Sequence, residues 1–356
     1  MVYMFTHDCD TGDSTMALIS IASIRKLPKV VKVLGAVTAV PAAIAAGYTV
    51  VSHAVFHRSN TSTAAEVYLR ATGGGKKPLK DMVLLDNTIL ERAETNDRRY
   101  TIPSSVTFKV SSREELLDGR QVFHLNQRPI NDRAVIYLHG GMFINQPTSE
   151  HWRFVEIIAQ RTRAEIIMPL YPLAPVHGAV EALDFIAKVY QATIEKYGVS
   201  NVTIMGDSCG GGIAASFAEH LPSLGLEQPG HLILISPWVD VTLRNPDILP
   251  YEASDPVLSA HGLQKLGLTW AKDLAPNDYR VSPVNGEVRN LRNVVVFIGT
   301  REIFYPDARL FYDRVNATGV HAELYIGRGL NHNYPLLLIP EAKRAIDRMV
   351  DTICTD

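Results

Sequence analysis

The sequence predicts an α/β fold, in which a mostly parallel central sheet is flanked by helices. Short apolar runs rich in Val, Ile and Leu alternate with longer helical segments from about residue 104 to the C-terminus. Strands that are apolar along their whole length are typical of parallel sheets, because helices cover both faces of such sheets. In open α/β sheets the functional residues gather at the carboxyl ends of the strands. Those ends are therefore where we expect the chemistry.

The apolar runs define the expected strands. Segments 106–110 and 121–125 alternate in polarity and are expected to pair as antiparallel neighbours. Further strands are expected at 133–141, 164–171, 201–207, 231–238, 293–299 and 321–327. Helices are expected at 149–162, 178–197, 210–221, 259–273, 306–318 and 340–353. This pattern predicts one catalytic domain over 104–356.

The N-terminal part has a different composition. Residues 33–56 form a run of 24 residues without Asp, Glu, Lys or Arg, long enough to span a bilayer as a helix. Four basic residues between Arg25 and Lys32 precede it, and the positive-inside rule then keeps segment 1–32 in the cytoplasm. We expect a single-pass membrane protein with its catalytic domain on the extracytoplasmic side. A cleaved signal peptide followed by secretion, or a buried hydrophobic helix, are the alternatives.

Residues 57–103 connect this apolar run to the catalytic domain. Segments 63–71 and 82–94 are expected to be short helices, and the glycine-rich segment 72–78 is expected to be a loop. These elements are too short to form a domain of their own. We expect them to act as a linker and as a cap over the site, together with an insertion at 239–259.

The composition argues against several classes of protein. The 356 residues include 35 basic and 37 acidic side chains, so the net charge of −2 provides no field that would attract nucleic acid. The three cysteines, Cys9, Cys209 and Cys354, lie far apart and have no metal-binding spacing with histidines. We therefore expect neither a disulfide framework nor a metal site.

The stretch Gly206-Asp207-Ser208-Cys209-Gly210 is a G-x-S-x-G pattern at a predicted strand-to-helix turn. A Ser on such a turn has a strained backbone, and small neighbours let the helix approach the strand. The helix N-terminus also offers free N–H groups to a developing oxyanion. Ser208 is therefore the predicted nucleophile, and the Cys209 N–H is a predicted oxyanion donor.

The segment "HGGMF", residues 139–143, ends an earlier predicted strand. Two glycines at this position allow the backbone to turn its N–H groups inward. Gly140 and Gly141 are therefore expected to complete the oxyanion hole together with the N–H of Cys209.

A serine nucleophile needs a base and an acid, which follow it along the chain in the order acid, then His. His332 lies in the loop after the last predicted strand and is the expected base. Glu302 follows the preceding strand, between apolar neighbours, and is the expected acid. Asp307 is the alternative acid, although a position at the start of a helix already explains it.

These motifs together resemble the α/β-hydrolase carboxylesterases of the hormone-sensitive-lipase-like group. The resemblance covers about 250 residues in chain order and is carried by six stretches: "HGG" at 139–141, "YPLAP" at 171–175, "GDSCGG" at 206–211, "SPW" at 236–238, "GTREIFYPD" at 299–307 and "GLNH" at 329–332. It implies hydrolysis of short acyl esters without a cofactor. It also implies the roles of Ser208, His332 and Glu302 given above.

The chain departs from the family pattern at two positions. Met142 stands where a third Gly is common, and Glu302 stands where Asp is most common. We expect Met142, Phe143 and Tyr251 to contribute to an apolar acyl pocket under the cap.

The sequence thus predicts a serine carboxylesterase that acts on short-to-medium acyl esters. A ligand-binding protein without catalysis on the same scaffold is one alternative. An amidase or peptidase of the same fold is another.

Overall fold

The computed structural model describes residues 45, 47–72, 76–127 and 129–355. The chain consists of two compact units, Met1–Val51 and Ser52–Asp356. The architecture reported below is that of the second unit.

The predicted membrane span 33–56 lies mainly outside the described residues, which begin at residue 45. Residues 47–50 are α-helical and Val51–Val55 form a π-helical turn. Within the described ranges, no helix combines the length and the apolar character needed to cross a bilayer. The anchor, its orientation and the alternative of a signal peptide remain predictions.

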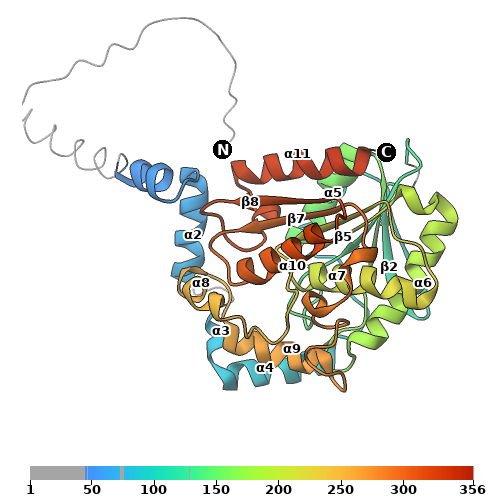
Figure 1. Cartoon of the computed structure of the whole chain (residues 1–356), viewed down its shortest axis with the longest axis horizontal. Helices are drawn as coiled ribbons and strands as arrows, with labels where there is room; N and C mark the ends of the chain where they lie inside the picture. The colour runs from blue at the N-terminus through green and yellow to red at the C-terminus, as the bar shows by residue number, and fades with distance from the viewer. Residues whose placement is uncertain (1–44, 46, 73–75, 128, 356) are drawn as a thin grey trace, which may run out of the picture. The chain divides into compact units, whose positions relative to one another are not determined.

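An eight-stranded sheet forms the centre of the second unit (Figure 1). Its strands are β1 Ser112–Leu117, β2 Arg120–Leu125, β3 Ala134–Leu138, β4 Glu165–Pro169, β5 Val202–Asp207, β6 His231–Ile235, β7 Val294–Gly299 and β8 Ala322–Gly327. Their spatial order is β1-β2-β4-β3-β5-β6-β7-β8. β2 pairs antiparallel with both β1 and β4, whereas all pairs from β4 to β8 are parallel. The predicted mostly parallel sheet is confirmed.

Helices cover both faces of the sheet (Figure 1). They are α5 Ser149–Thr162, α6 Ala179–Tyr197, α7 Cys209–His220, α10 Tyr305–Ala317 and α11 Pro340–Cys354. Along β3, Ile136 packs in the cluster that contains α6, α7 and α10, and Tyr137 packs in the cluster that contains α5 and α11. Successive strand residues point to opposite faces, so a strand buried on both sides must be apolar throughout.

One predicted strand, 106–110, is wrong. The edge strand is instead β1, which pairs with β2 from Ser112 opposite Leu125 to Leu117 opposite Arg120. Val106, Phe108 and Val110 pack against the cluster of α5 and α11 without a strand partner. Apolar and polar residues alternate here because one face of an extended segment is buried. The sequence pattern alone does not distinguish such a segment from a strand that pairs in a sheet.

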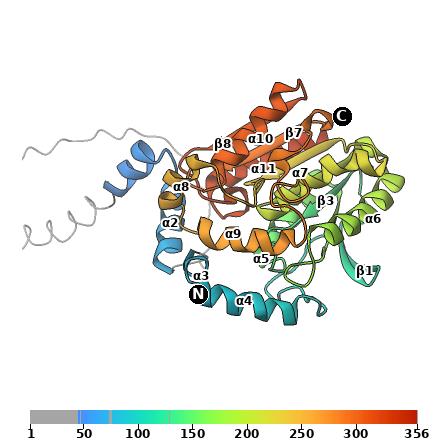
Figure 2. The same cartoon turned by 60° about the horizontal axis from the view of Figure 1, so that its bottom comes forward.

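The helices within the two segments expected to form the cap are α2 Asn60–Thr72, α3 Lys76–Lys80, α4 Met82–Thr95 and α8 Leu249–Ser254. They lie together with α9 Ala260–Ala271 (Figure 2). The end of the predicted loop 72–78 is thus helical. α3 touches α9 so closely that a Cβ on Gly262 would lie 2.4 Å from Leu79 O. Lys76 Nζ donates to Asp255 O at 2.8 Å and joins α3 to the 239–259 segment.

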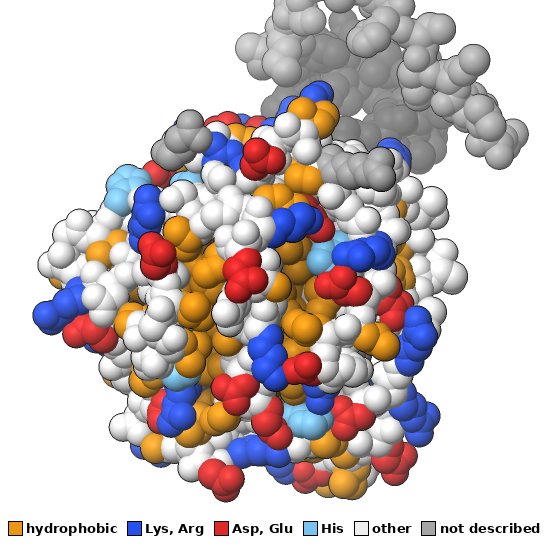
Figure 3. All heavy atoms as spheres, turned by 90° about the vertical axis from the view of Figure 1, so that its right-hand side faces the viewer, with side chains coloured by type: hydrophobic (Ala, Val, Ile, Leu, Met, Phe, Trp, Pro, Cys, Tyr) orange, Lys and Arg blue, Asp and Glu red, His pale blue; other side chains and the backbone are white. Residues whose placement is uncertain are grey.

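One face of the molecule carries acidic and basic side chains interspersed around apolar ones (Figure 3). This mixture matches the near balance of charge in the sequence. Neither sign dominates that face.

Glu219, near the end of α7, is a buried carboxyl group with an unusual environment. It is 8% exposed, and among the described residues neither of its carboxylate oxygens has a hydrogen-bond partner. Burial raises the pKa of Glu219 to about 9, although the charge of Arg314 acts in the opposite direction. The folded state therefore holds a protonated Glu219 at neutral pH.

We predict that Glu219→Gln stabilises the protein at pH 8 and changes its stability little near pH 4. The folded-state pKa is raised, so the stability contributed by the protonated group is complete below the unfolded-state pKa and is lost as pH rises towards 9. Gln imitates the neutral acid and removes that loss, which is on the order of a few kcal/mol. Thermal unfolding at both pH values tests this, and an equal shift in Tm at both would contradict it.

Candidate active site

Ser208 occupies a sharp turn between β5 and α7. Its backbone lies at φ 54° and ψ −124°, a region that side chains other than glycine rarely adopt. A Cβ on Gly206 would lie 2.3 Å from Gly210 O, and one on Gly210 would lie 2.1 Å from Leu138 O. Only glycine allows these approaches, so the small residues around Ser208 hold it in a strained conformation at the end of β5.

Three side chains from separate loops form a continuous chain of hydrogen bonds. His332 Nε2 lies 3.0 Å from Ser208 Oγ, and His332 Nδ1 lies 2.6 Å from Glu302 Oε2. The loops follow β5, β7 and β8, whose carboxyl ends meet at one edge of the sheet. The structure thus brings together the three residues that the sequence singles out. This is the geometry of a nucleophile, a base and an orienting acid.

Glu302 is fully buried and its carboxylate is well satisfied. Besides His332 on one oxygen, its Oε1 accepts hydrogen bonds from Ser236 Oγ at 2.8 Å and from Gly299 N at 2.7 Å. The alternative acid, Asp307, accepts from Asn245 Nδ2 at 2.8 Å and makes no hydrogen bond with His332. Burial raises the pKa of Asp307 to about 6. Glu302 is the carboxylate in position to orient the imidazole.

Opposing effects act on the imidazole of His332. Burial lowers its pKa, while the negative charge and hydrogen bond of Glu302 raise it, and the net pKa lies above the usual value of 6.5. The charge of Asp255, a buried residue at the end of α8, acts in the same direction as Glu302. The site therefore favours the imidazolium that forms when His332 accepts a proton.

The predicted oxyanion donors differ in what they contact. Gly140 N donates to Asp207 Oδ1 at 2.8 Å, so this N–H is already used, contrary to the prediction. Gly141, at φ 132°, and Cys209, the first residue of α7, make no such bond through their N–H groups in the described part of the chain. A glycine turn alone does not reveal which of its N–H groups points inward.

Asp207, which directly precedes Ser208, is fully buried and has several hydrogen-bond partners. Its Oδ1 also accepts from Tyr137 Oη at 2.6 Å, and its Oδ2 accepts from Asn333 Nδ2 at 2.6 Å. His151 Nε2 lies 3.4 Å from the same oxygen. Asp207 thus joins the HGG turn, the Ser208 turn and the His332 loop.

Sequence reasoning missed several of these supporting residues. Ser236, which donates to Glu302, also accepts from Asn333 N at 3.0 Å. Asp255 Oδ2 accepts from Ile303 N at 3.0 Å and so connects the cap to the loop of Glu302. The sequence offered one clue to Ser236 and Asn333, because Ser236 opens the "SPW" stretch and Asn333 directly follows "GLNH". Asp255 had none.

The predicted acyl-pocket residues have different environments. Phe143 is 2% exposed and stacks on Trp270 at 4.7 Å and beside Trp238 at 4.9 Å, so it belongs to the core. Met142 is half-buried and packs against the same core. Tyr251 is half-buried in α8 and stacks on Tyr305 at 5.3 Å. Phe143 therefore packs within the core and exposes little surface to a substrate.

The side chain of Cys209, the residue after Ser208, packs in the core. Its side chain is fully buried, and its Sγ accepts a hydrogen bond from Phe143 N at 3.2 Å. Burial raises the pKa of the Cys209 thiol to about 12. Because only the thiolate is a good nucleophile, this Cys does not compete with Ser208.

Among the described residues, no group of three or more His, Cys, Asp or Glu side chains is arranged to hold a metal ion.

A model of the alpha/beta hydrolase fold family matches residues 135–336, more than half of the chain. The chain therefore belongs to this family. An esterase from Acinetobacter venetianus is 34% identical over 220 residues, which cover 60% of this chain and 72% of the relative. A triacylglycerol lipase from Mycobacterium tuberculosis is 32% identical over 184 residues, covering 51% of this chain but 38% of the lipase.

Solved structures agree with this assignment. A candidate esterase from Staphylococcus aureus is 32% identical with a TM-score of 0.75, covering 78% of this chain and 94% of that one. An esterase of the bacterial hormone-sensitive lipase family has a TM-score of 0.65 at 23% identity, covering 76% of this chain and 97% of that one, which shows a shared fold. The chain is a carboxylic ester hydrolase of the hormone-sensitive-lipase-like group, as its motifs predict.

We predict that Cys209 resists alkylation in the folded protein while the exposed Cys354 reacts. Burial and the raised pKa both suppress the Cys209 thiolate. Treatment with iodoacetamide at pH 8, followed by peptide mass spectrometry, measures labelling at each site, and the same treatment in urea is the control. Labelling of Cys209 at the rate of Cys354 without denaturant would contradict the prediction.

Proposed function

We propose that this protein is a serine carboxylesterase that uses Ser208, His332 and Glu302 as nucleophile, base and acid. The observation that carries the proposal is the chain of hydrogen bonds from Ser208 Oγ through His332 to the buried Glu302 carboxylate. The order of these residues along the chain and their loops after β5, β7 and β8 support it.

In the proposed first half-reaction, His332 Nε2 takes the proton of Ser208 Oγ as the oxygen attacks the ester carbonyl carbon. The carbonyl π electrons move to oxygen and form a tetrahedral oxyanion. The C–O bond to the alcohol then breaks, and the imidazolium returns its proton to the leaving alkoxide. Glu302 keeps Nδ1 protonated and stabilises the imidazolium throughout.

In the second half-reaction, water attacks the acyl-enzyme while His332 again accepts the proton. The tetrahedral intermediate collapses, the bond to Ser208 Oγ breaks as the imidazolium of His332 returns the proton to that oxygen, and the carboxylic acid leaves. The N–H groups of Gly141 and Cys209 supply hydrogen bonds to the oxyanion in both steps. Their freedom from partners within the described chain supports this role.

We propose esters of short-to-medium acyl chains as substrates. The named activities of the relatives, an esterase and a triacylglycerol lipase among them, support an acyl ester. The half-buried Met142, which packs against the apolar core, and the half-buried Tyr251, which stacks on Tyr305, support an apolar acyl pocket. The N-terminal segment 33–56 is proposed to anchor the enzyme in a membrane.

We predict that Ser208→Ala lowers kcat for p-nitrophenyl butyrate by at least about a thousandfold, because the nucleophile is lost. The assay uses the full chain and a series of p-nitrophenyl esters from acetate to palmitate. Ser200→Ala, an exposed serine in the turn before β5, is the matched control and is expected to stay within about twofold. Equal turnover by wild type and Ser208→Ala would instead support a ligand-binding protein.

We also predict an acid limb in the pH dependence of kcat/KM that lies above pH 6.5. His332 must be neutral to accept a proton, and Glu302 raises its pKa, so activity falls as pH drops through that raised pKa. Glu302→Gln removes the negative charge, which moves the limb to lower pH and lowers kcat by about a hundredfold or more. A limb that stays in place in Glu302→Gln would contradict the assignment of the acid.

A further inference from the structure

The segment that precedes the catalytic domain contains a buried cluster of ionic groups. Glu66 of α2 is 4% exposed, and its carboxylate accepts from Arg301 Nη2 at 2.7 Å and from Arg301 Nε at 2.9 Å. Arg58 Nη1 and Arg70 Nε donate to the same carboxylate, the latter at 2.8 Å. Three arginines therefore converge on one carboxylate, and the pKa of Glu66 is lowered to about 2 because their hydrogen bonds and charges outweigh burial.

This cluster is attached to the loop of the proposed acid. Arg301 directly precedes Glu302, and its guanidinium makes a two-bond contact with Glu66 that fixes both distance and direction. The backbone N–H of Arg301 donates to Leu330 O at 3.0 Å. A shift of Arg301 would therefore move both Glu302 and the neighbouring His332 loop.

The cluster also holds the loop of the proposed base. Arg58 Nη1 donates to Gly329 O at 2.7 Å, and Gly329 N donates to Thr300 Oγ1 at 2.8 Å. Gly329 has φ 69°, and a Cβ at this position would lie 1.8 Å from Phe56 O. The guanidinium groups of Arg58 and Arg301 both lie over the ring of Phe56, at 4.6 and 4.7 Å from its centroid.

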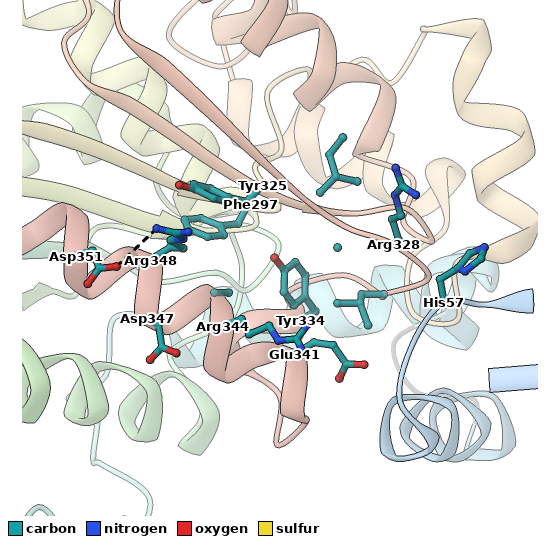
Figure 4. Close-up of a pocket in the computed structure, with 14 residues that line it drawn as sticks. His57, Phe297, Tyr325, Arg328, Tyr334, Glu341, Arg344, Asp347, Arg348 and Asp351 are labelled. Carbon is teal, nitrogen blue, oxygen red and sulfur yellow. Dashed lines mark ion pairs between the residues drawn. The ribbon is translucent and has the colours of Figure 1, made fainter. Parts of the chain in front are cut away.

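One side of the His332 loop borders open space, although Leu330 and Tyr334 on that side are buried in the core cluster of α5 and α11. A pocket of about 820 Å³ opens there between β8 and α11, and Figure 4 shows Arg328, Tyr334 and His57 around it. Neither Ser208, Glu302 nor His332 lines this pocket, so it lies behind the site and is not its entrance. On this side the contacts of the loop with Arg58 and Phe56 add to the hydrogen bonds that Asn333 makes with Asp207 and Ser236.

We propose that Arg58 and Glu66 are positioning residues of the esterase site, which hold the loops of Glu302 and His332 in register with Ser208. The inference rests on the proposed function. Arg58 and Glu66 lie in segment 57–103, for which the sequence predicts a linker and a cap, and the proposal gives this segment an effect on the rate of catalysis. Small displacements of catalytic groups cost about a hundredfold in rate, so a contact remote from the substrate is able to control kcat.

The test compares Glu66→Gln with wild type in the full chain. Gln keeps the shape of the side chain but removes the charge, which leaves the buried Arg58 guanidinium without its counter-ion. Active sites are counted by stoichiometric inactivation with diethyl p-nitrophenyl phosphate, so that kcat is expressed per reactive Ser208. Glu91→Gln is the matched control, since Glu91 is an exposed residue of α4 whose ion pair is with Arg92.

For Glu66→Gln we expect kcat per titrated site to fall about ten- to a hundredfold with KM within about threefold. The acid limb of the pH profile should move to lower pH, because a looser Glu302 raises the pKa of His332 less. Glu66→Asp should recover part of the loss. Glu91→Gln should match wild type in kcat and in the pH profile.

A kcat per titrated site within twofold of wild type in Glu66→Gln would overturn the proposal. Any loss of total activity would then reflect a smaller number of folded molecules. If Glu66→Gln does not fold, Arg58→Lys decides in the same assays. Lysine keeps the charge but cannot reach Thr63, Glu66 and Gly329 at once. Failure of the proposed function is distinct, because wild type itself would then neither hydrolyse the ester nor react with the phosphate.

Discussion

The arrangement of the site depends on how closely α7 approaches the sheet at Ser208. The backbone of Ser208 is held at positive φ, and Gly206 and Gly210 permit contacts with main-chain oxygens that no larger residue allows. This strain is balanced by backbone hydrogen bonds around the turn, such as Ser208 N to Ile235 O at 2.8 Å. With Ser208 fixed in this way, His332 and Glu302 reach it from the loops that follow β8 and β7.

Those loops are held by buried polar groups that connect distant parts of the chain. Asp207 joins the HGG turn to the His332 loop, and Ser236 joins Glu302 to Asn333. Glu66 adds the segment before the catalytic domain to this network. Each partner satisfies a group whose desolvation would otherwise be costly, so the network is both a stabilising and an orienting element.

These contacts between loops connect residues 52–72 to the site, although none of these residues is proposed to react with the substrate. Residues 52–72 lie in the same compact unit as the sheet, and Arg58 and Glu66 reach the loops that follow β7 and β8. The two segments predicted to form the cap also meet, where Lys76 contacts the 239–259 segment. The cap and the catalytic loops are therefore one connected structure.

The sequence by itself determined the sheet, the helices that cover it and the motif around Ser208, because burial on two faces and a tight turn leave local patterns of apolar residues and glycines. It also singled out Glu302 and His332, whose side chains the structure brings into hydrogen-bond contact. Only the tertiary structure decided that Glu302 rather than Asp307 contacts His332, that the Gly140 N–H is occupied and that 106–110 has no strand partner. These outcomes depend on side chains far apart in sequence, which no local pattern encodes.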